Sequence, residues 1–213
     1  MRSLVRGASL SIILSLVPQL HGAIITYSNR TSWQSSFAPP SDFFVDFSTF
    51  TQDSSFRTSA VDTGPFALQQ LGTGSSQNLV DTAAFNLMDN NGTNYAANKV
   101  DPNTQVKMNF LIPVVAWGAD FYDAIPGLID VVLSLDDNST VTYQPSAIDG
   151  FFGFFVNDGR AVTMITFRAA GAQGQHFGLD DVEGKFIPEP STWALVASGL
   201  ALAFLSRRKL FRR

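Results

Sequence analysis

The chain of 213 residues contains 14 basic and 18 acidic residues and no cysteine. The lack of cysteine excludes disulfides, thiol catalysis and zinc sites built on cysteine. The charge is unevenly distributed, because residues 24–187 hold seven basic and seventeen acidic side chains, a net charge of −10, whereas both ends of the chain are basic. A surface that binds nucleic acid must be basic, so this acidic segment excludes nucleic acid as a partner.

The first 23 residues have the pattern of a secretory signal peptide. Arg2 and Arg6 form a basic start, residues 10–17 form a short apolar run, and Pro18 precedes small residues. The apolar run is too short to span a bilayer, which favours a cleaved signal over an anchor. We therefore expect a signal helix in residues 1–23, with signal peptidase as a partner and cleavage after Ala23.

The segment 24–187 is long enough to fold as one domain with its own core. Near its start, Asn29 can cap a helix in which Trp33 and Phe37 lie on one face. Long helical periodicity is absent from the rest of the segment. The sequence therefore predicts a single short helix at the N-terminal end of this domain.

Alternating apolar residues predict β-strands in the second half of the domain. The alternation is clearest in residues 106–110, 115–121, 129–135 and 141–143. We expect residues 151–156 and 161–167 to pair as a hairpin around Asn157-Asp158-Gly159, and a closing strand over residues 177–182. Residues 51–104, rich in Ser, Thr, Gly and Asn, predict long loops with short strands only near residues 66–68 and 86–88.

Short strands separated by turns predict an all-β fold, a jelly-roll-like antiparallel β-sandwich of about eight strands. Its core is expected to contain Val115, Trp117, Phe121, Val131, Leu133, Ile165 and Phe167.

Three consecutive features end the chain, in residues 188–213. Pro188, Glu189 and Pro190 predict a stiff extended spacer, because proline locks φ and disfavours helix. The apolar run from Trp193 to Leu205 predicts a hydrophobic transmembrane helix of about 20 Å, marginal against a hydrocarbon core of about 30 Å. The positive-inside rule then keeps the basic tail in the cytoplasm. This tail contains Arg207, Arg208, Lys209, Arg212 and Arg213.

This arrangement resembles the bacterial PEP-CTERM sorting signal, down to the wording Pro-Glu-Pro-Ser-Thr-Trp at residues 188–193. The resemblance implies processing by an exosortase, a membrane-bound enzyme similar to cysteine proteases. It also implies export, transient anchoring in the inner membrane, and then a place at the cell surface or in the extracellular biofilm matrix. Exopolysaccharide is the further partner that it implies.

The domain itself resembles secreted domains that often accompany this signal. The resemblance rests on Val45-Asp46-Phe47, on Phe152-Gly153-Phe154 and on residues 176–182. It implies a jelly roll related to carbohydrate-binding modules.

Catalytic machinery is sparse in this domain. His176 is its single histidine, and no Gly-x-Ser-x-Gly motif accompanies it, so a Ser-His-Asp triad is not indicated. We expect a non-enzymatic protein with no catalytic residues and no cofactor other than a possible calcium ion. Two alternatives stay open, namely a secreted hydrolase that uses Asp carboxylates paired in space, and a structural matrix component with no specific ligand.

The closing strand places two carboxylates side by side in the sequence, at Asp180 and Asp181. Because side chains alternate along a strand, one of them is expected to face inward, which is costly unless it is paired or bound to a cation. Lys185 and Arg168 could provide that pairing. Calcium is the alternative, and the likeness to carbohydrate-binding jelly rolls implies an ion that brings Asp46 toward Asp180 or Asp181.

Overall fold

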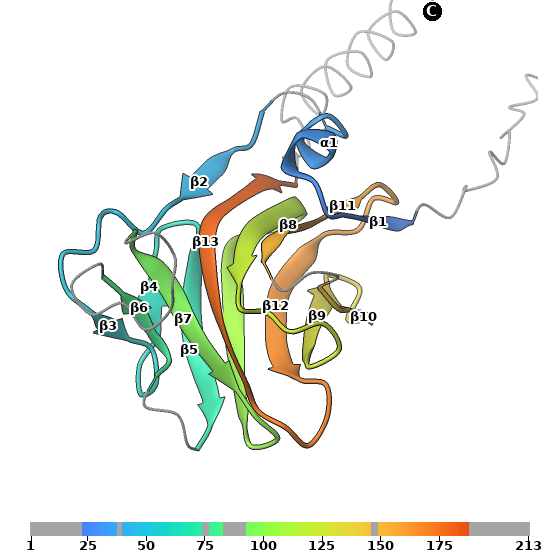
Figure 1. Cartoon of the computed structure of the whole chain (residues 1–213). Helices are drawn as coiled ribbons and strands as arrows, with labels where there is room; N and C mark the ends of the chain where they lie inside the picture. The colour runs from blue at the N-terminus through green and yellow to red at the C-terminus, as the bar shows by residue number, and fades with distance from the viewer. Residues whose placement is uncertain (1–22, 38–39, 74–76, 83–92, 146–148, 188–213) are drawn as a thin grey trace, which may run out of the picture.

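The computed structural model describes residues 23–37, 40–73, 77–82, 93–145 and 149–187. These residues form one short helix and thirteen strands, and every strand pairing is antiparallel (Figure 1). The signal helix predicted in residues 1–23, apart from Ala23, lies outside the described residues, as do the strand predicted near residues 86–88 and the C-terminal segment 188–213. The elements are β1 Ile24–Tyr27, α1 Arg30–Gln34, β2 Phe43–Val45, β3 Ser54–Ser55, β4 Val61–Asp62, β5 Phe66–Gly72, β6 Leu79–Asp81, β7 Tyr95–Val100, β8 Thr104–Tyr122, β9 Ile129–Leu135, β10 Thr140–Tyr143, β11 Gly150–Val156, β12 Val162–Ala169 and β13 Gln175–Phe186.

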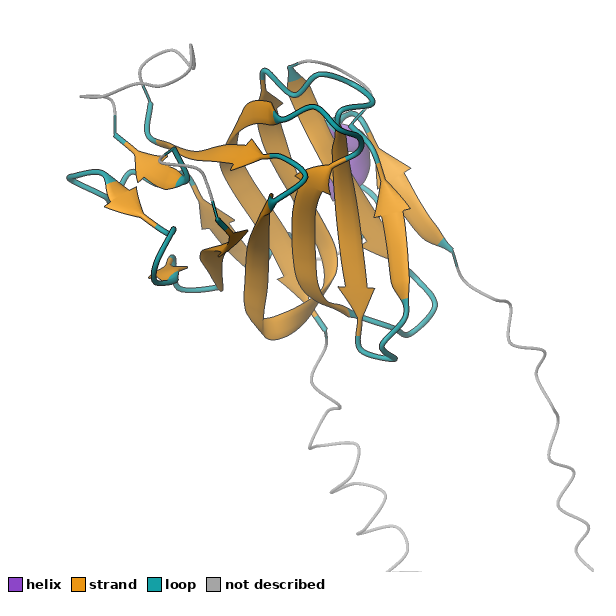
Figure 2. Cartoon of the chain, turned by 90° about the horizontal axis from the view of Figure 1, so that it is seen from below, coloured by secondary structure: helices purple, strands orange, loops and turns teal. Residues whose placement is uncertain are grey.

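The strands form one continuous hydrogen-bonded sheet that folds over itself into a sandwich (Figure 2). One layer contains β4, β5, the first half of β8, β12, β9 and β10. The other contains β1, β11, the second half of β8 and β13, with β7 and β2 along the outer edge of β13 and with β6 and β3 beyond β7. The predicted all-β sandwich is confirmed.

The long strand β8 belongs to both layers because it bends in the middle. Its first half pairs with β5 and β12, and its second half pairs with β11 and β13. The bend falls at Leu111–Pro113, where alternation in burial is interrupted. A strand that changes layers in this way forms a corner of a sandwich. The sequence predicted two separate strands here, and the structure joins them into one.

The aromatic core lies between the two layers. The ring of Phe167 on β12 lies 6.3 Å from those of Trp117 and Phe121 on β8 and 5.5 Å from that of Phe177 on β13, measured between ring centroids. Six of the seven predicted core residues are buried, namely Trp117, Phe121, Val131, Leu133, Ile165 and Phe167. Val115 is only half-buried, which corrects the prediction. The register of β8 against β13 shifts between Ala116 and Val114, so Val115 lies in an irregularity of the pairing.

Two further expectations about the strands were wrong. Residues 151–156 and 161–167 do not form a hairpin, because β11 pairs with β1 and β8 whereas β12 pairs with β8 and β9. The turn between them carries the chain from one layer to the other. The described part of residues 51–104 contains five strands, β3 to β7, rather than long loops with two, although the strand expected near residues 66–68 is present as the start of β5. Tertiary pairing decides these short strands, because their local sequence has little strand preference.

The helix α1 covers the outer face of the second layer. Asn29 caps it, since the Asn29 side chain accepts a hydrogen bond from the Ser32 amide at 2.9 Å. Trp33 is fully buried and donates its indole N–H to the carbonyl of Phe154 at 2.8 Å, while its ring contacts Phe37 and Phe151. The predicted N-terminal helix is confirmed, and it lies beside the strands that carry the candidate site. Within the ranges given above, no helix is long and apolar enough to cross a bilayer.

Candidate functional site

The closing strand β13 changes its neighbour at Asp180 and Asp181. Residues before this pair are bonded to β7, with Leu179 opposite Ala96, and residues after it are bonded to β2, with Val182 opposite Val45. On its other edge the register against β8 shifts at the same place, between Asp180 and Glu183. The two aspartates therefore occupy a gap in the outer edge of β13 and a bulge against its inner neighbour. Bulges re-aim side chains and are frequent next to functional sites.

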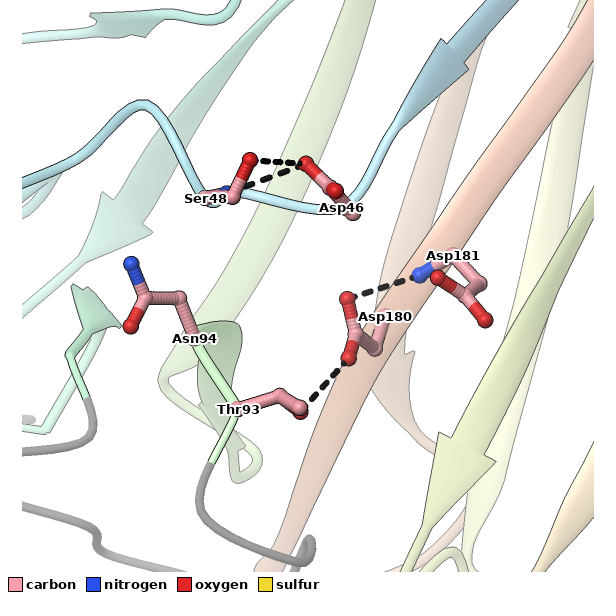
Figure 3. A pocket seen from close by; sticks show the side chains of 6 residues that line it. All are labelled: Asp46, Ser48, Thr93, Asn94, Asp180 and Asp181. Atoms are coloured by element: carbon pink, nitrogen blue, oxygen red, sulfur yellow. Dashed lines mark hydrogen bonds between the residues drawn. The ribbon is translucent and has the colours of Figure 1, made fainter.

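An open pocket of about 380 Å³ lies at this gap (Figure 3). Three segments supply its lining: the end of β2, the residues just before β7, and β13. All six lining residues carry oxygen in their side chains: Asp46, Ser48, Thr93, Asn94, Asp180 and Asp181. The three aspartates that the sequence analysis singled out are thus gathered around one pocket.

Asp180 is the most deeply buried of the lining carboxylates, with 4% of its surface exposed. One of its oxygens accepts a hydrogen bond from the hydroxyl of Thr93 at 3.0 Å, and the other accepts the backbone amide of Asp181 at 2.8 Å. The carboxylate points toward the Thr93 segment, across the pocket from β2 (Figure 3). The expectation that one aspartate faces inward is met by Asp180, whereas Asp181 is half-buried.

The opposite wall is a tight turn after β2. The carboxylate of Asp46 accepts the amide of Ser48 at 3.0 Å and its hydroxyl at 2.7 Å. The amide group of Asn94 donates to the carbonyls of Phe47 at 3.0 Å and Phe50 at 2.8 Å. Asn94 thereby ties the residues before β7 to the turn after β2, which fixes the width of the pocket.

Backbone strain is concentrated at this pocket. Four non-glycine residues among those described have a positive φ, and two of them border the pocket: Phe47 with φ of 56° and Asp181 with φ of 49°. A positive φ is uncommon for a bulky residue such as phenylalanine and costs free energy. The side chain of Phe47 is buried in the core, and that burial holds the strained turn in place.

The electrostatic environments of the lining carboxylates differ. Burial raises the pKa of Asp180 to about 7, and the charge of Asp181 adds to the effect. Burial also raises the pKa of Asp181, although Arg30 opposes this shift. The hydrogen bonds from Ser48 lower the pKa of Asp46. One wall of the pocket therefore holds a carboxyl group that is partly protonated at neutral pH, and the other holds a carboxylate.

The ion pairs near Asp180 and Asp181 differ from those expected. Lys185 pairs with Asp42 at 3.3 Å, and Arg168 pairs with Asp130 at 3.1 Å. The cation that reaches this part of β13 is Arg30 from α1, whose guanidinium donates to the backbone carbonyl of Asp181 at 3.0 Å.

Arg30 belongs to a network behind the pocket. It pairs with Asp120 on β8 at 3.1 Å and with Glu183 on β13, and its guanidinium carbon lies 4.8 Å from the centre of the Phe151 ring. This network joins the helix, β8, β11 and β13 and supports the bulge that carries Asp181. No sequence pattern predicts this network, because its members are separated by up to 153 positions.

The pocket is only partly suited to a metal ion. Its lining offers carboxylate, hydroxyl and amide oxygens, the ligand types that calcium takes. Yet among the described residues no three His, Cys, Asp or Glu side chains lie close enough together to hold a metal ion. Calcium at Asp46, Asp180 and Asp181 therefore stays a prediction, and binding it would require at least one of these side chains to turn.

Sequence reasoning missed half of the pocket. Ser48 could have been found, because Asp-x-Ser is the pattern of a turn closed by an aspartate side chain. Thr93 and Asn94 carry no such signal and reach the pocket through the pairing of β7 with β13. His176 lies opposite Lys99 in that same pairing, and burial together with Lys99 lowers its pKa.

The comparison with protein families concerns the end of the chain. Residues 186–209 match the PEP-CTERM protein-sorting motif. The match includes Pro188, Glu189 and Pro190, the apolar run from Trp193 to Leu205 and part of the basic tail, nearly all of which lie outside the described residues. No curated protein matches the chain. The motif confirms the predicted sorting signal and implies an exported, exosortase-dependent cell-surface protein.

Proposed function

We propose that this cell-surface protein is a non-enzymatic polysaccharide-binding component, held briefly in the inner membrane before it reaches the exterior. The apolar run from Trp193 to Leu205 serves as the transient anchor, and the Arg-rich tail holds it with the C-terminus in the cytoplasm. Signal peptidase removes residues 1–23, and an exosortase acts at the Pro-Glu-Pro motif. The domain of residues 24–187 is the part that remains outside and contacts exopolysaccharide.

The pocket at Asp46, Asp180 and Asp181 supports polysaccharide as the ligand. Sugars present dense arrays of hydroxyl groups, which donate to carboxylates and accept from amide and hydroxyl groups. The lining offers these partners on facing walls, and its volume of about 380 Å³ lies in the usual range for small-ligand sites. The net charge of −10 in residues 24–187 favours a neutral polysaccharide over an acidic one.

Retention on insoluble polysaccharides tests this proposal. The exported protein is incubated with a neutral β-glucan, a mannan and acidic alginate, with and without millimolar calcium. We expect retention on a neutral polymer and loss of retention in Asp46→Asn and Asp181→Asn.

The matched control is Asp137→Asn. Asp137 also closes an Asp-x-Ser turn, with the Ser139 amide at 2.9 Å and its hydroxyl at 2.5 Å, but it is remote in sequence and does not line the pocket. Equal retention of all three variants would mean that the polysaccharide binds the domain outside this pocket. No retention on any polymer would favour a structural matrix component with no specific ligand.

One observation favours a secreted hydrolase as the second candidate. Asp180, with its pKa raised to about 7, and Asp46, with a lowered pKa, lie on opposite walls of the pocket. Carboxyl groups whose pKa values are pushed apart suit the roles of general acid and of base or nucleophile. In this reading Asp180 protonates the leaving-group oxygen and Asp46 activates water or attacks the sugar.

Release of reducing ends separates the two candidates. Wild-type protein that only binds releases none from the polymer that retains it. A hydrolase releases them, and Asp180→Asn then stops release while retention persists, because asparagine resembles the neutral, protonated form of Asp180 but cannot donate a proton to a leaving group.

A further inference from the structure

The corner formed by the bend of β8 exposes two consecutive large apolar side chains. Leu111 is 69% exposed and Ile112 is 45% exposed. Side chains of a flat strand alternate between core and solvent, but at the bend both point outward. Exposed apolar side chains are common one at a time, whereas an adjacent pair at the tip of a corner forms a small continuous apolar surface.

The chain leaves the domain beside this corner. Phe186, the last residue of β13, lies opposite Val114 in the pairing with β8. The backbone amide of Ile187 then donates to the carbonyl of Pro113 at 2.9 Å. The exit of the chain is thus fastened to the residue that follows Leu111 and Ile112.

The distance from this exit to the proposed anchor is short. Only residues 188–192 separate Ile187 from Trp193, where the apolar run begins. A fully extended chain spans at most about 3.6 Å per residue, so Ile187 lies at most about 22 Å from Trp193. Tryptophan prefers the membrane interface, whose polar zone is about 5–8 Å thick on each side. While the precursor is anchored, the corner therefore stays within reach of the lipid headgroups.

The charges beside the exit do not oppose such an approach. Lys185 and Asp42 form an ion pair at 3.3 Å, and the other oxygen of Asp42 accepts the amide of Phe186 at 2.9 Å. These charges cancel each other at the exit, although the domain as a whole is acidic. An apolar tip on an acidic domain, with the two charges at the exit paired, suits a zwitterionic phospholipid surface better than an anionic one.

We propose that Leu111 and Ile112 insert into the headgroup region of the inner membrane while the precursor is anchored. The corner then acts as a second contact that orients the domain on the bilayer and presents the Pro-Glu-Pro segment at a defined height. This inference rests on the proposed anchoring by residues 193–205 and is independent of polysaccharide binding.

A single labelled cysteine tests the contact, because the chain has no cysteine of its own. Ile112→Cys and Ile125→Cys are prepared in the full-length precursor, labelled with an environment-sensitive fluorophore and reconstituted into phosphatidylcholine vesicles. Ile125 is the matched control, since it is also 45% exposed. Ile125 lies two residues after Asp123, whose carbonyl accepts a hydrogen bond from Gln175 at the far end of β13. The eleven steps from Gln175 to Phe186 span at most about 36 Å, so the control position is remote from the exit.

Headgroup-labelled nitroxide lipids then report proximity to the bilayer. We expect blue-shifted emission and at least about twofold stronger quenching at position 112 than at position 125. Flotation of the vesicles separates the two claims. A precursor that does not float overturns the anchoring and the corner contact together. A precursor that floats but shows equal quenching at both positions overturns the corner contact alone. Blue-shifted but unquenched emission at position 112 also overturns it, because protein and not lipid would then cover the corner.

Discussion

Glu183 on β13 and Arg30 on α1 form an ion pair across 153 positions of the sequence. Glu183 is the single glutamate of residues 24–187, and its side chain is 6% exposed. Gln34 donates to both of its oxygens at 3.1 Å, and the hydroxyl of Ser41 donates at 2.7 Å. One carboxylate thus holds both the helix and the segment that leads to β2, the strand after which Asp46 lines the pocket.

Removing Glu183 should therefore destabilise the domain strongly. Glu183→Ala leaves Arg30 partly buried beside a single remaining carboxylate, and we expect the free energy of unfolding to fall by about 3 kcal/mol. The double variant Arg30→Met, Glu183→Leu should lose less free energy of unfolding than Glu183→Ala, because neither charge is left buried alone. Urea unfolding of the exported protein measures both. A double variant less stable than the single one would contradict this account.

Trp117 should be among the most costly core residues to truncate. It is fully buried, and its ring stacks on Phe154 with centroids 6.0 Å apart. Trp117→Ala is expected to lower the free energy of unfolding by about 3–5 kcal/mol. Val115→Ala on the same strand is the control and should cost clearly less, since Val115 is half-buried in the irregular part of the pairing. Equal losses of unfolding free energy in the two variants would mean that Val115 is a core residue.

Stability should depend on pH through Asp180. Its pKa is raised from 3.8 to about 7 in the folded protein, so between these values the folded state holds a proton that the unfolded chain releases. The stabilisation from this proton is complete below about pH 4 and is lost as the pH rises through about 7. Asp180→Asn cannot ionise, so its melting temperature should exceed that of the wild type near pH 8.

Melting curves across the pH range check this expectation. The difference in melting temperature between Asp180→Asn and the wild type should shrink toward about pH 4. Each kcal/mol of stability that the variant gains near neutral pH corresponds to a rise of roughly 2–4 °C in melting temperature. Asp137→Asn, at an exposed turn, should not reproduce this pH dependence. An advantage that is constant with pH would mean that ionisation of Asp180 is not its cause.

Calcium, if it binds at Asp46, Asp180 and Asp181, should raise the melting temperature by mass action, and a chelator should lower it. Asp46→Asn should abolish the shift and Asp137→Asn should preserve it, although both variants alter the same kind of turn. A midpoint that calcium leaves unmoved, while Asp181→Asn still changes stability, would assign these aspartates a purely structural role.

The mature surface protein should lack both ends of the encoded chain. Intact-mass measurement on protein recovered from the native surface should show an N-terminus after Ala23 and no Arg207–Arg213 tail. Replacing Pro188 and Pro190 by alanine should leave precursor in the inner membrane, because the spacer then loses the two residues that exclude helix. An exported form that still carries the arginine-rich tail would contradict removal of the C-terminal segment.

The sequence by itself determined the sorting signal and the class of fold. The Pro-Glu-Pro motif and the apolar run are local patterns, readable without any tertiary contact, and residues 186–209 match the sorting motif. Alternation of apolar residues likewise located β9 and the hydrophobic face of β8, because side-chain direction in a strand is a local property. The cap at Asn29 was readable for the same reason.

Only the tertiary structure decided which strands are neighbours and what lines the pocket. The partners of β11 and β12 follow from the layer in which each strand buries its apolar face, and a turn such as Asn157–Gly159 permits a hairpin without requiring one. The likeness to carbohydrate-binding jelly rolls implied that Asp46 approaches Asp180 or Asp181, but Thr93 and Asn94 join them only because β13 exchanges β7 for β2 at that point. Arg30 meets Glu183 for a comparable reason, since an ion pair between distant segments depends on packing that no short stretch of sequence encodes.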